Sequence, residues 1–200
     1  ESNFRKIAPS AVGVHLLTGP IQVTKQVTGP GAKYAADAFR VDVVCEAAGA
    51  PLDLGDQATV TLSEANGYTH RIDGIPVPAS CTLTEQGEVG EFGETSRSGT
   101  PVDLAVEIPA SADDEVPEAQ AATITNDYQL TGLSVTKRVS TSATEAEFGP
   151  FSFTLGCTSI TGRPVTFDDE GSTELEFAIG PGETFTAPAN RIPVGATCTL

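Results

Sequence analysis

Polar and apolar residues alternate with a period of two along most of the chain, which is the pattern of β-strands with one buried face. Turn clusters rich in Gly, Pro, Asp and Ser separate the alternating runs. The pattern predicts seven short strands in the first half of the chain, near residues 21–28, 38–45, 57–63, 68–73, 80–86, 102–108 and 121–128. Strands at this spacing predict an all-β fold, an antiparallel β-sandwich of the immunoglobulin-like kind.

Three segments of the chain recur in the same order. Residues 21–27 (IQVTKQV) reappear as 133–139 (LSVTKRV), and residues 39–45 (FRVDVVC) reappear as 151–157 (FSFTLGC). A third pair joins IPVPASCTL, which begins at Ile75, to IPVGATCTL, which begins at Ile192. Blocks repeated at a nearly constant offset predict two tandem β-sandwich modules.

The repeat also sets the expected module boundaries. We expect a complete module over residues 20–128, a short and stiff junction over 129–132, and a second module over 133–200 that is incomplete at its C-terminal end. Residues 1–19 match neither module and are expected to be a lead-in or the end of a preceding module. The chain is therefore expected to belong to a longer array, with neighbouring repeats as its partners.

Three polar residues lie on faces that the alternation assigns to the core. Lys25 shares a face with Val23, Glu85 shares one with Leu83, and Asn126 lies among apolar neighbours of the last strand. Burial of an unpaired ammonium group costs several kcal/mol, so its position needs a cause. Two simple interpretations remain open. Either the lysine lies at a strand end and reaches water along its alkyl chain, or lysine and glutamate form a buried ion pair beside an uninvolved asparagine.

The three residue types also suggest a reaction. A desolvated lysine loses its proton more readily and becomes a nucleophile. Its attack on an asparagine carboxamide would form an amide between side chains and release ammonia, while the glutamate would shuttle protons and polarise the carboxamide. Such a bond forms once in each molecule, so we expect a self-modifying module and not an enzyme with turnover.

The order Lys in VTK (Lys25), Glu in TLTE (Glu85) and Asn in ITN (Asn126) resembles the Cna B-type modules of Gram-positive surface adhesins and pilins. The wider pattern, with its two cysteines and a Tyr after the last strand, also resembles an actinobacterial surface repeat of unassigned function. The resemblance implies a prealbumin-like sandwich with a spontaneous isopeptide bond. It assigns Lys25 as nucleophile, Glu85 as catalytic carboxyl and Asn126 as acceptor.

Two further residues are candidates for the same chemistry. Asp127 is the alternative acceptor next to Asn126, but the alternation points it outward. Lys137 repeats Lys25 in the second module, and its glutamate and asparagine partners are expected beyond Leu200. We therefore expect Lys137 to be unpaired within residues 133–200.

Each module also holds one pair of cysteines at matching places. Cys45 and Cys81 lie on inward faces of the first module, and Cys157 and Cys198 repeat them in the second. Disulfides within the modules are the natural choice among the three possible connectivities. A metal site is not expected, because there is no CxxC motif and the two histidines are remote from the cysteines.

Charge excludes several classes of partner. The chain has 11 Lys and Arg against 27 Asp and Glu, a formal net charge of -16. Such a chain repels phosphate backbones and anionic lipid surfaces, so nucleic-acid binding is not expected. No apolar run approaches the roughly 20 residues of a membrane span, and no motif predicts a cofactor. Four cysteines in an acidic chain without Met indicate an oxidising, extracellular compartment.

The sequence therefore predicts a stalk repeat of a secreted or wall-anchored surface protein, braced by an isopeptide bond and by disulfides. An unknown extracellular ligand would be bound by another region. Two alternatives remain open. The chain could be a ligand-binding module, such as an adhesin or carbohydrate-binding sandwich that uses its end loops, or a spacer domain of a secreted enzyme.

Overall fold

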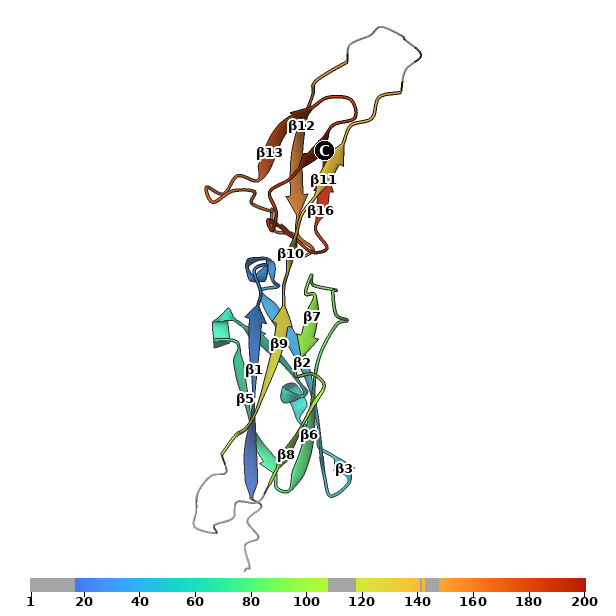
Figure 1. Cartoon of the computed structure of the whole chain (residues 1–200). Helices are drawn as coiled ribbons and strands as arrows, with labels where there is room; N and C mark the ends of the chain where they lie inside the picture. The colour runs from blue at the N-terminus through green and yellow to red at the C-terminus, as the bar shows by residue number, and fades with distance from the viewer. Residues whose placement is uncertain (1–16, 108–117, 141, 143–147) are drawn as a thin grey trace, which may run out of the picture.

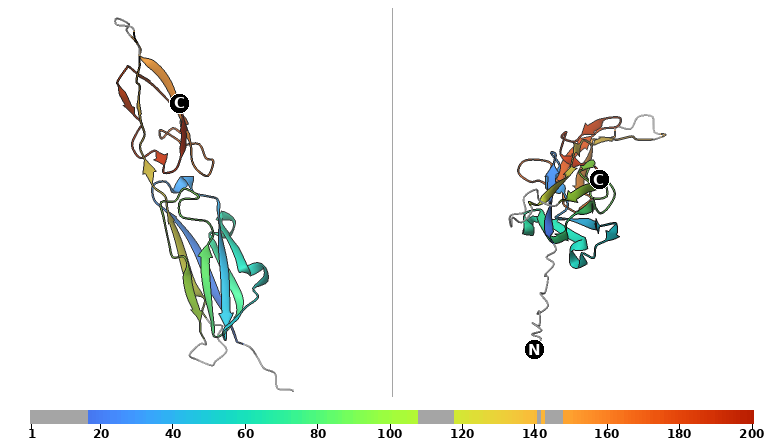
Figure 2. Two further views of the ribbon diagram at one scale, coloured as in Figure 1. Left: turned by 90° about the vertical axis from the view of Figure 1, so that its right-hand side faces the viewer. Right: turned by 90° about the horizontal axis from the view of Figure 1, so that it is seen from below.

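The computed structural model describes residues 17–107, 118–140, 142 and 148–200. These residues form two β-rich bodies stacked end to end along one long axis (Figure 1), as the left view of Figure 2 also shows. Strands β1 to β9 build the first body, strands β11 to β16 build the second, and β10 (Leu130–Thr131) lies between them. Most of the expected lead-in, up to residue 16, lies outside the described residues.

Two sheets share one hydrophobic core in the first body. One sheet has the strand order β5-β1-β9-β7, and the other has the order β3-β2-β6-β8, with β4 also paired to β2. The strands are β1 (Thr18–Thr28), β2 (Ala38–Ala47), β3 (Ala50–Pro51), β4 (Thr59–Ser63), β5 (Thr69–Pro76), β6 (Ala79–Glu85), β7 (Ser96–Ser98), β8 (Val102–Val106) and β9 (Gln120–Asp127).

The predicted all-β sandwich is confirmed. Each of the seven expected strands is present within a few residues of its predicted position, because alternation along a strand follows directly from which face is buried. The short strands β3 and β7 were not predicted, since two or three residues are too few to show a period. Three single turns of 3₁₀ helix were also missed, namely η1 (Ala32–Tyr34), η2 (Gly55–Ala58) and η3 (Glu64–Asn66).

One pairing differs from the antiparallel prediction. Strands β1 and β9, the first and the last of the module, lie side by side and run parallel, with Val27 opposite Asn126. Strand β8 belongs to the other sheet, and β9 begins at the same end of the sandwich as β1 (Figure 1). This pairing brings residues about 100 positions apart in the sequence into contact.

The described residues of the second body form three small antiparallel sheets. Strand β12 (Phe151–Thr158) pairs with β13 (Glu174–Ile179) and β16 (Thr197–Thr199), while β11 (Ser134–Thr136) pairs with β14 (Thr184–Thr186). Strand β15 (Ile192–Pro193) pairs with β10 and so ties the junction to this body. No helix in the described part of the chain is long and apolar enough to cross a membrane.

Tyr34 of η1 connects the first body to the second. Its side chain is only 4% exposed. The backbone N–H of Thr166 donates to its hydroxyl oxygen at 3.1 Å, and the Thr161 hydroxyl donates to its backbone carbonyl at 2.8 Å. The ring lies in the hydrophobic core of the second module, whose other buried members are Leu155, Cys157, Val165, Phe167, Ala187 and Ile192.

Polar contacts surround this tyrosine. Arg163 of the second body donates to the backbone carbonyl of Lys33 at 2.8 Å and forms an ion pair with Asp37. The Lys33 ammonium donates to the Thr166 hydroxyl at 2.8 Å. The short linker is therefore reinforced by side chains on both sides of the junction.

Candidate functional site

Lys25, Glu85 and Asn126 meet inside the first module. The Lys25 ammonium donates to Glu85 Oε2 at 2.7 Å, and Asn126 Nδ2 donates to Glu85 Oε1 at 2.8 Å. All three residues are at most 5% exposed. The two carboxylate oxygens of Glu85 thus bridge the amine and the carboxamide.

Three strands place these side chains on inward faces. Lys25 lies on β1, Glu85 ends β6, and Asn126 lies near the end of β9. In the parallel register of β1 and β9, Lys25 lies opposite Ile124, two residues before Asn126, so the lysine and the asparagine are diagonal neighbours on adjacent strands. Pairing of β6 with β2 places Glu85 opposite Val41 and faces it toward them from the other sheet. The strand-end interpretation of Lys25, with its ammonium in water, is wrong because the side chain is fully buried.

Burial shifts the protonation equilibrium of Lys25 toward the neutral amine. The ammonium lies 4.6 Å from the centre of the Phe39 ring. Burial lowers the pKa of Lys25, and the hydrogen bond to Glu85 only partly opposes this shift. A lysine with a lowered pKa exposes its nitrogen lone pair at a higher fraction near neutral pH.

A second buried ion pair, which the alternation of polar and apolar residues did not predict, adjoins the first. Arg97 on β7 forms an ion pair with Glu94, and both side chains are at most 5% exposed. Arg97 Nη1 also donates to the carbonyl of Gly87 at 2.7 Å, and Nε lies 3.5 Å from Glu85 Oε1. The one feature of the sequence that could have indicated the burial of Arg97 is the alternation in Ser-Arg-Ser of β7, and three residues are too few to show a period.

Three buried polar atoms of the described residues lack a hydrogen-bond partner, and all belong to this cluster. They are Arg97 Nε, Asn126 Oδ1 and the Tyr128 hydroxyl. An unsatisfied buried group costs about 1–3 kcal/mol, so such a concentration calls for a reason. Burial raises the pKa of Tyr128 to about 12, so its hydroxyl keeps its proton and can donate it.

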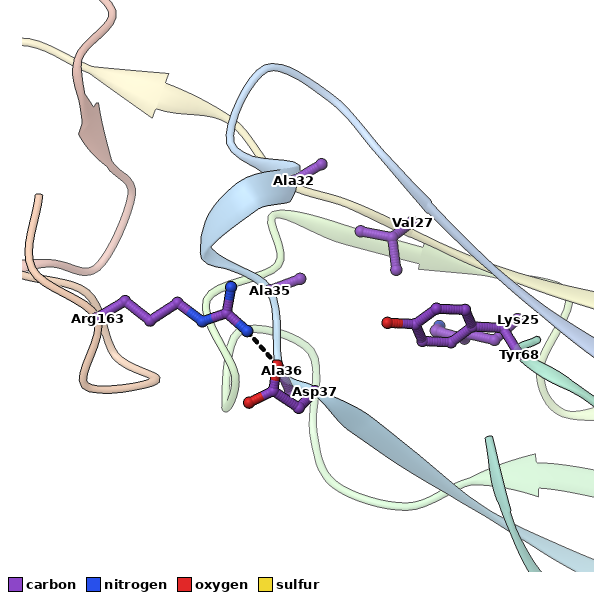
Figure 3. Close-up of a pocket in the computed structure, with 8 residues that line it drawn as sticks. All are labelled: Lys25, Val27, Ala32, Ala35, Ala36, Asp37, Tyr68 and Arg163. Carbon is purple, nitrogen blue, oxygen red and sulfur yellow. Dashed lines mark hydrogen bonds and ion pairs between the residues drawn. The ribbon is translucent and has the colours of Figure 1, made fainter. Parts of the chain in front are cut away.

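A pocket of about 310 Å³ lies beside the lysine, between the two bodies. Tyr68, Val27 and Lys25 line one side, and the Arg163–Asp37 ion pair lies on the other (Figure 3). The remaining lining residues are the small side chains of Ala32, Ala35 and Ala36.

A family model described as "Domain of unknown function (DUF5979)" matches residues 21–129 and again residues 133–200. The chain belongs to this family. A search of curated proteins found no match. The two matched segments of the DUF5979 model correspond to the two bodies of the structure.

Solved structures similar to this DUF5979 chain include pilins and Cna repeats. The T-13 major pilin of Streptococcus pyogenes is 12% identical, with 92% of this chain and 80% of that chain covered and a TM-score of 0.47. Another major pilin of S. pyogenes is 13% identical, with 92% and 81% covered and a TM-score of 0.44. Two B repeat units of the collagen-binding protein Cna of Staphylococcus aureus are 14% identical, with 91% and 44% covered and a TM-score of 0.38. Pilins and Cna B repeats, which the sequence pattern resembles, are thus among the solved structures to which the chain is similar.

Each DUF5979 module contains one disulfide, and the described residues include no free cysteine. Cys45 on β2 is bonded to Cys81 on β6, and Cys157 on β12 is bonded to Cys198 on β16. In both modules the bridge joins neighbouring antiparallel strands within one sheet. No group of three or more potential metal ligands occurs among the residues that the structure describes.

The second DUF5979 module repeats only part of the cluster. Lys137 lies 4.5 Å from the centre of the Phe151 ring, as Lys25 does from that of Phe39. No carboxylate of the described residues lies within ion-pair distance of Lys137. Asp127, the alternative acceptor, faces away from Lys25 and accepts a hydrogen bond from Thr28 Oγ1 at 3.0 Å.

Proposed function

We propose that this chain is a structural repeat of a secreted or wall-anchored bacterial surface protein, and that an isopeptide bond between Lys25 and Asn126 locks its first module. The buried bridge from Lys25 through Glu85 to Asn126 is the observation that supports this proposal. Apolar residues at these three positions would stabilise the core at least as well, because buried ion pairs contribute little net stability. Stability alone therefore does not explain the three polar residues.

The reaction needs no external co-reactant. The neutral Nζ of Lys25 attacks Cγ of Asn126, the new C–N bond forms, and the bond from Cγ to Nδ2 breaks. Of the three protons on the lysine ammonium, one remains on the new amide and two pass through Glu85 to the leaving nitrogen, which departs as ammonium. Glu85 is suited to this relay because its two oxygens already contact the attacking and the leaving nitrogens.

Proximity in the folded core lowers the activation barrier of the reaction. Holding two reactants in a productive geometry can contribute about 7–11 kcal/mol of the barrier. The same geometry ties the first strand to the last, and the chain-entropy model assigns about 5 kcal/mol to closing a loop of about 100 residues. A covalent tie of this kind suits an exposed repeat that must resist unfolding and proteolysis.

Intact mass after disulfide reduction tests the proposal. The parent chain should be lighter than its sequence by one ammonia, and digestion should yield a branched peptide that joins β1 to β9. Lys25→Ala and Asn126→Ala should each abolish this loss, and Glu85→Gln should leave both reactants present but unjoined. Lys137→Ala is the matched control, because Lys137 also lies over a phenylalanine ring. This substitution should leave the loss of one ammonia unchanged. A parent chain of full sequence mass would refute the cross-link.

A further inference from the structure

The bridging position of Glu85 leaves one part of the reaction without a residue. Attack on Asn126 Cγ moves an electron pair onto Oδ1, and this developing negative charge needs a hydrogen-bond donor. In the folded chain Glu85 contacts Nδ2 and not Oδ1, so in this arrangement it gives Oδ1 no hydrogen bond. Asn126 Oδ1 has no partner in the folded chain.

We propose that the hydroxyl of Tyr128 is the donor that stabilises the negative charge on Asn126 Oδ1 while the bond to Lys25 forms. This inference rests on the proposed cross-link and adds a catalytic residue to it. It is carried by two unsatisfied atoms of one cluster, since the Tyr128 hydroxyl is a buried donor without an acceptor and Asn126 Oδ1 is a buried acceptor without a donor.

The strand geometry places these two side chains together. Residues two apart on a strand point to the same face, and their Cα atoms lie about 7 Å apart. The Tyr128 N–H donates to the carbonyl of Thr28 at 2.9 Å, so the pairing of β9 with β1 continues through this residue. Asn126 and Tyr128 are both at most 2% exposed, so the two side chains lie on one buried face.

Packing holds the Tyr128 ring in place before the reaction. The residue is 2% exposed and packs with Phe39 and Ala35 in a small cluster of its own. A donor held by its ring needs little reorganisation when charge develops on the carbonyl oxygen, which is what makes such a donor effective.

Arg97 does not compete for this role. Its Nη1 and Nη2 are engaged by a backbone carbonyl and by Glu94, and its free Nε lies 3.5 Å from Glu85 Oε1. The guanidinium therefore lies beside the Glu85 carboxylate, and Glu94 offsets its positive charge. Arg97 Nε and the Tyr128 hydroxyl are the two unsatisfied donors of the cluster, and of these Nε lies within ion-pair distance of Glu85.

The time course of ammonia loss in the full chain tests this inference. Parent, Tyr128→Phe and Tyr34→Phe chains are synthesised in a cell-free system, stopped in denaturant at intervals and weighed after disulfide reduction. Loss of one donor to a developing oxyanion slows catalysis by about 100-fold or more, so Tyr128→Phe should accumulate as folded, unjoined protein that reacts slowly. Tyr34→Phe removes another buried hydroxyl outside the cluster and should react at the parent rate.

The outcomes separate the two proposals. If the parent loses ammonia and Tyr128→Phe loses it equally fast, the role of Tyr128 is refuted while the cross-link stands. If the parent loses none, both fail. If Tyr128→Phe does not fold, 4-aminophenylalanine at position 128 decides, because it restores a donor at the same place on the ring. A folded chain with this residue should react near the parent rate, and its failure to react would overturn the inference.

Discussion

Replacement of Tyr34 by alanine should destabilise the second module, although the residue belongs to the first. Tyr34 is 4% exposed and completes the hydrophobic core around Leu155 and Val165. Truncation of a buried aromatic side chain to alanine costs about 3–5 kcal/mol. Its hydroxyl also accepts the N–H of Thr166 at 3.1 Å, and leaving that donor without a partner adds about 1 kcal/mol or more.

Hydrogen–deuterium exchange resolved by peptide measures this effect in the intact chain. If the free energy of unfolding of the second module falls by about 3 kcal/mol, its amides should exchange on the order of 100-fold faster. Each 1.4 kcal/mol corresponds to a factor of about ten. Peptides from β12 and β13 should show the increase, while peptides from β1 and β9 should change little.

The control is Tyr34→Phe, which keeps the ring and removes only the hydroxyl. It should cost about 0.5–1.5 kcal/mol and raise exchange in the same peptides by roughly tenfold at most. If Tyr34→Ala leaves exchange in β12 and β13 at the parent level, the tyrosine does not stabilise the second core and the interlocked junction is wrong.

Three further changes probe the first module. Replacing both Cys45 and Cys81 by Ala should lower the free energy of unfolding by about 4 kcal/mol, measured by denaturant titration against the oxidised parent. Gly99→Ala should destabilise by about 1–3 kcal/mol in the same assay, because Gly99 has φ of 73° and a Cβ would overlap a backbone carbonyl of β9. Hydrogen bonds, chiefly from Gln129, hold the pKa of Asp127 below its usual value. Its contribution is therefore present above pH of about 4 and lost as the pH falls through the lowered pKa, and Asp127→Asn should flatten this acid limb of thermal stability.

The inward positions of Lys25, Glu85 and Asn126 could be predicted because side-chain direction along a strand is a local property. A period of two fixes which residues share a face, whatever the rest of the chain does. The same rule placed the two cysteine pairs on inward faces. Strand ends were predicted less well, since turns and tertiary contacts set them.

The parallel pairing of β1 with β9 could not be predicted from alternation. A strand with one buried face alternates in the same way whether its neighbour runs parallel or antiparallel to it. Glu94 and Arg97 were missed because their burial depends on the path of the loop between β6 and β7. Tyr34 was missed for a related reason: its ring is buried by residues of another module, and nothing in the segment around it shows this. Contacts of this kind follow from chain topology and not from local pattern.

The tyrosine at the junction makes the order of repeats matter. With the offset that aligns Phe39 with Phe151, the position of Tyr34 corresponds to Ala146 in the second module. The two repeats are therefore not interchangeable building blocks. Recombination that duplicated or shuffled them would separate the second module from the tyrosine that completes its core. The pair, and not the single repeat, is therefore the unit that can be moved intact.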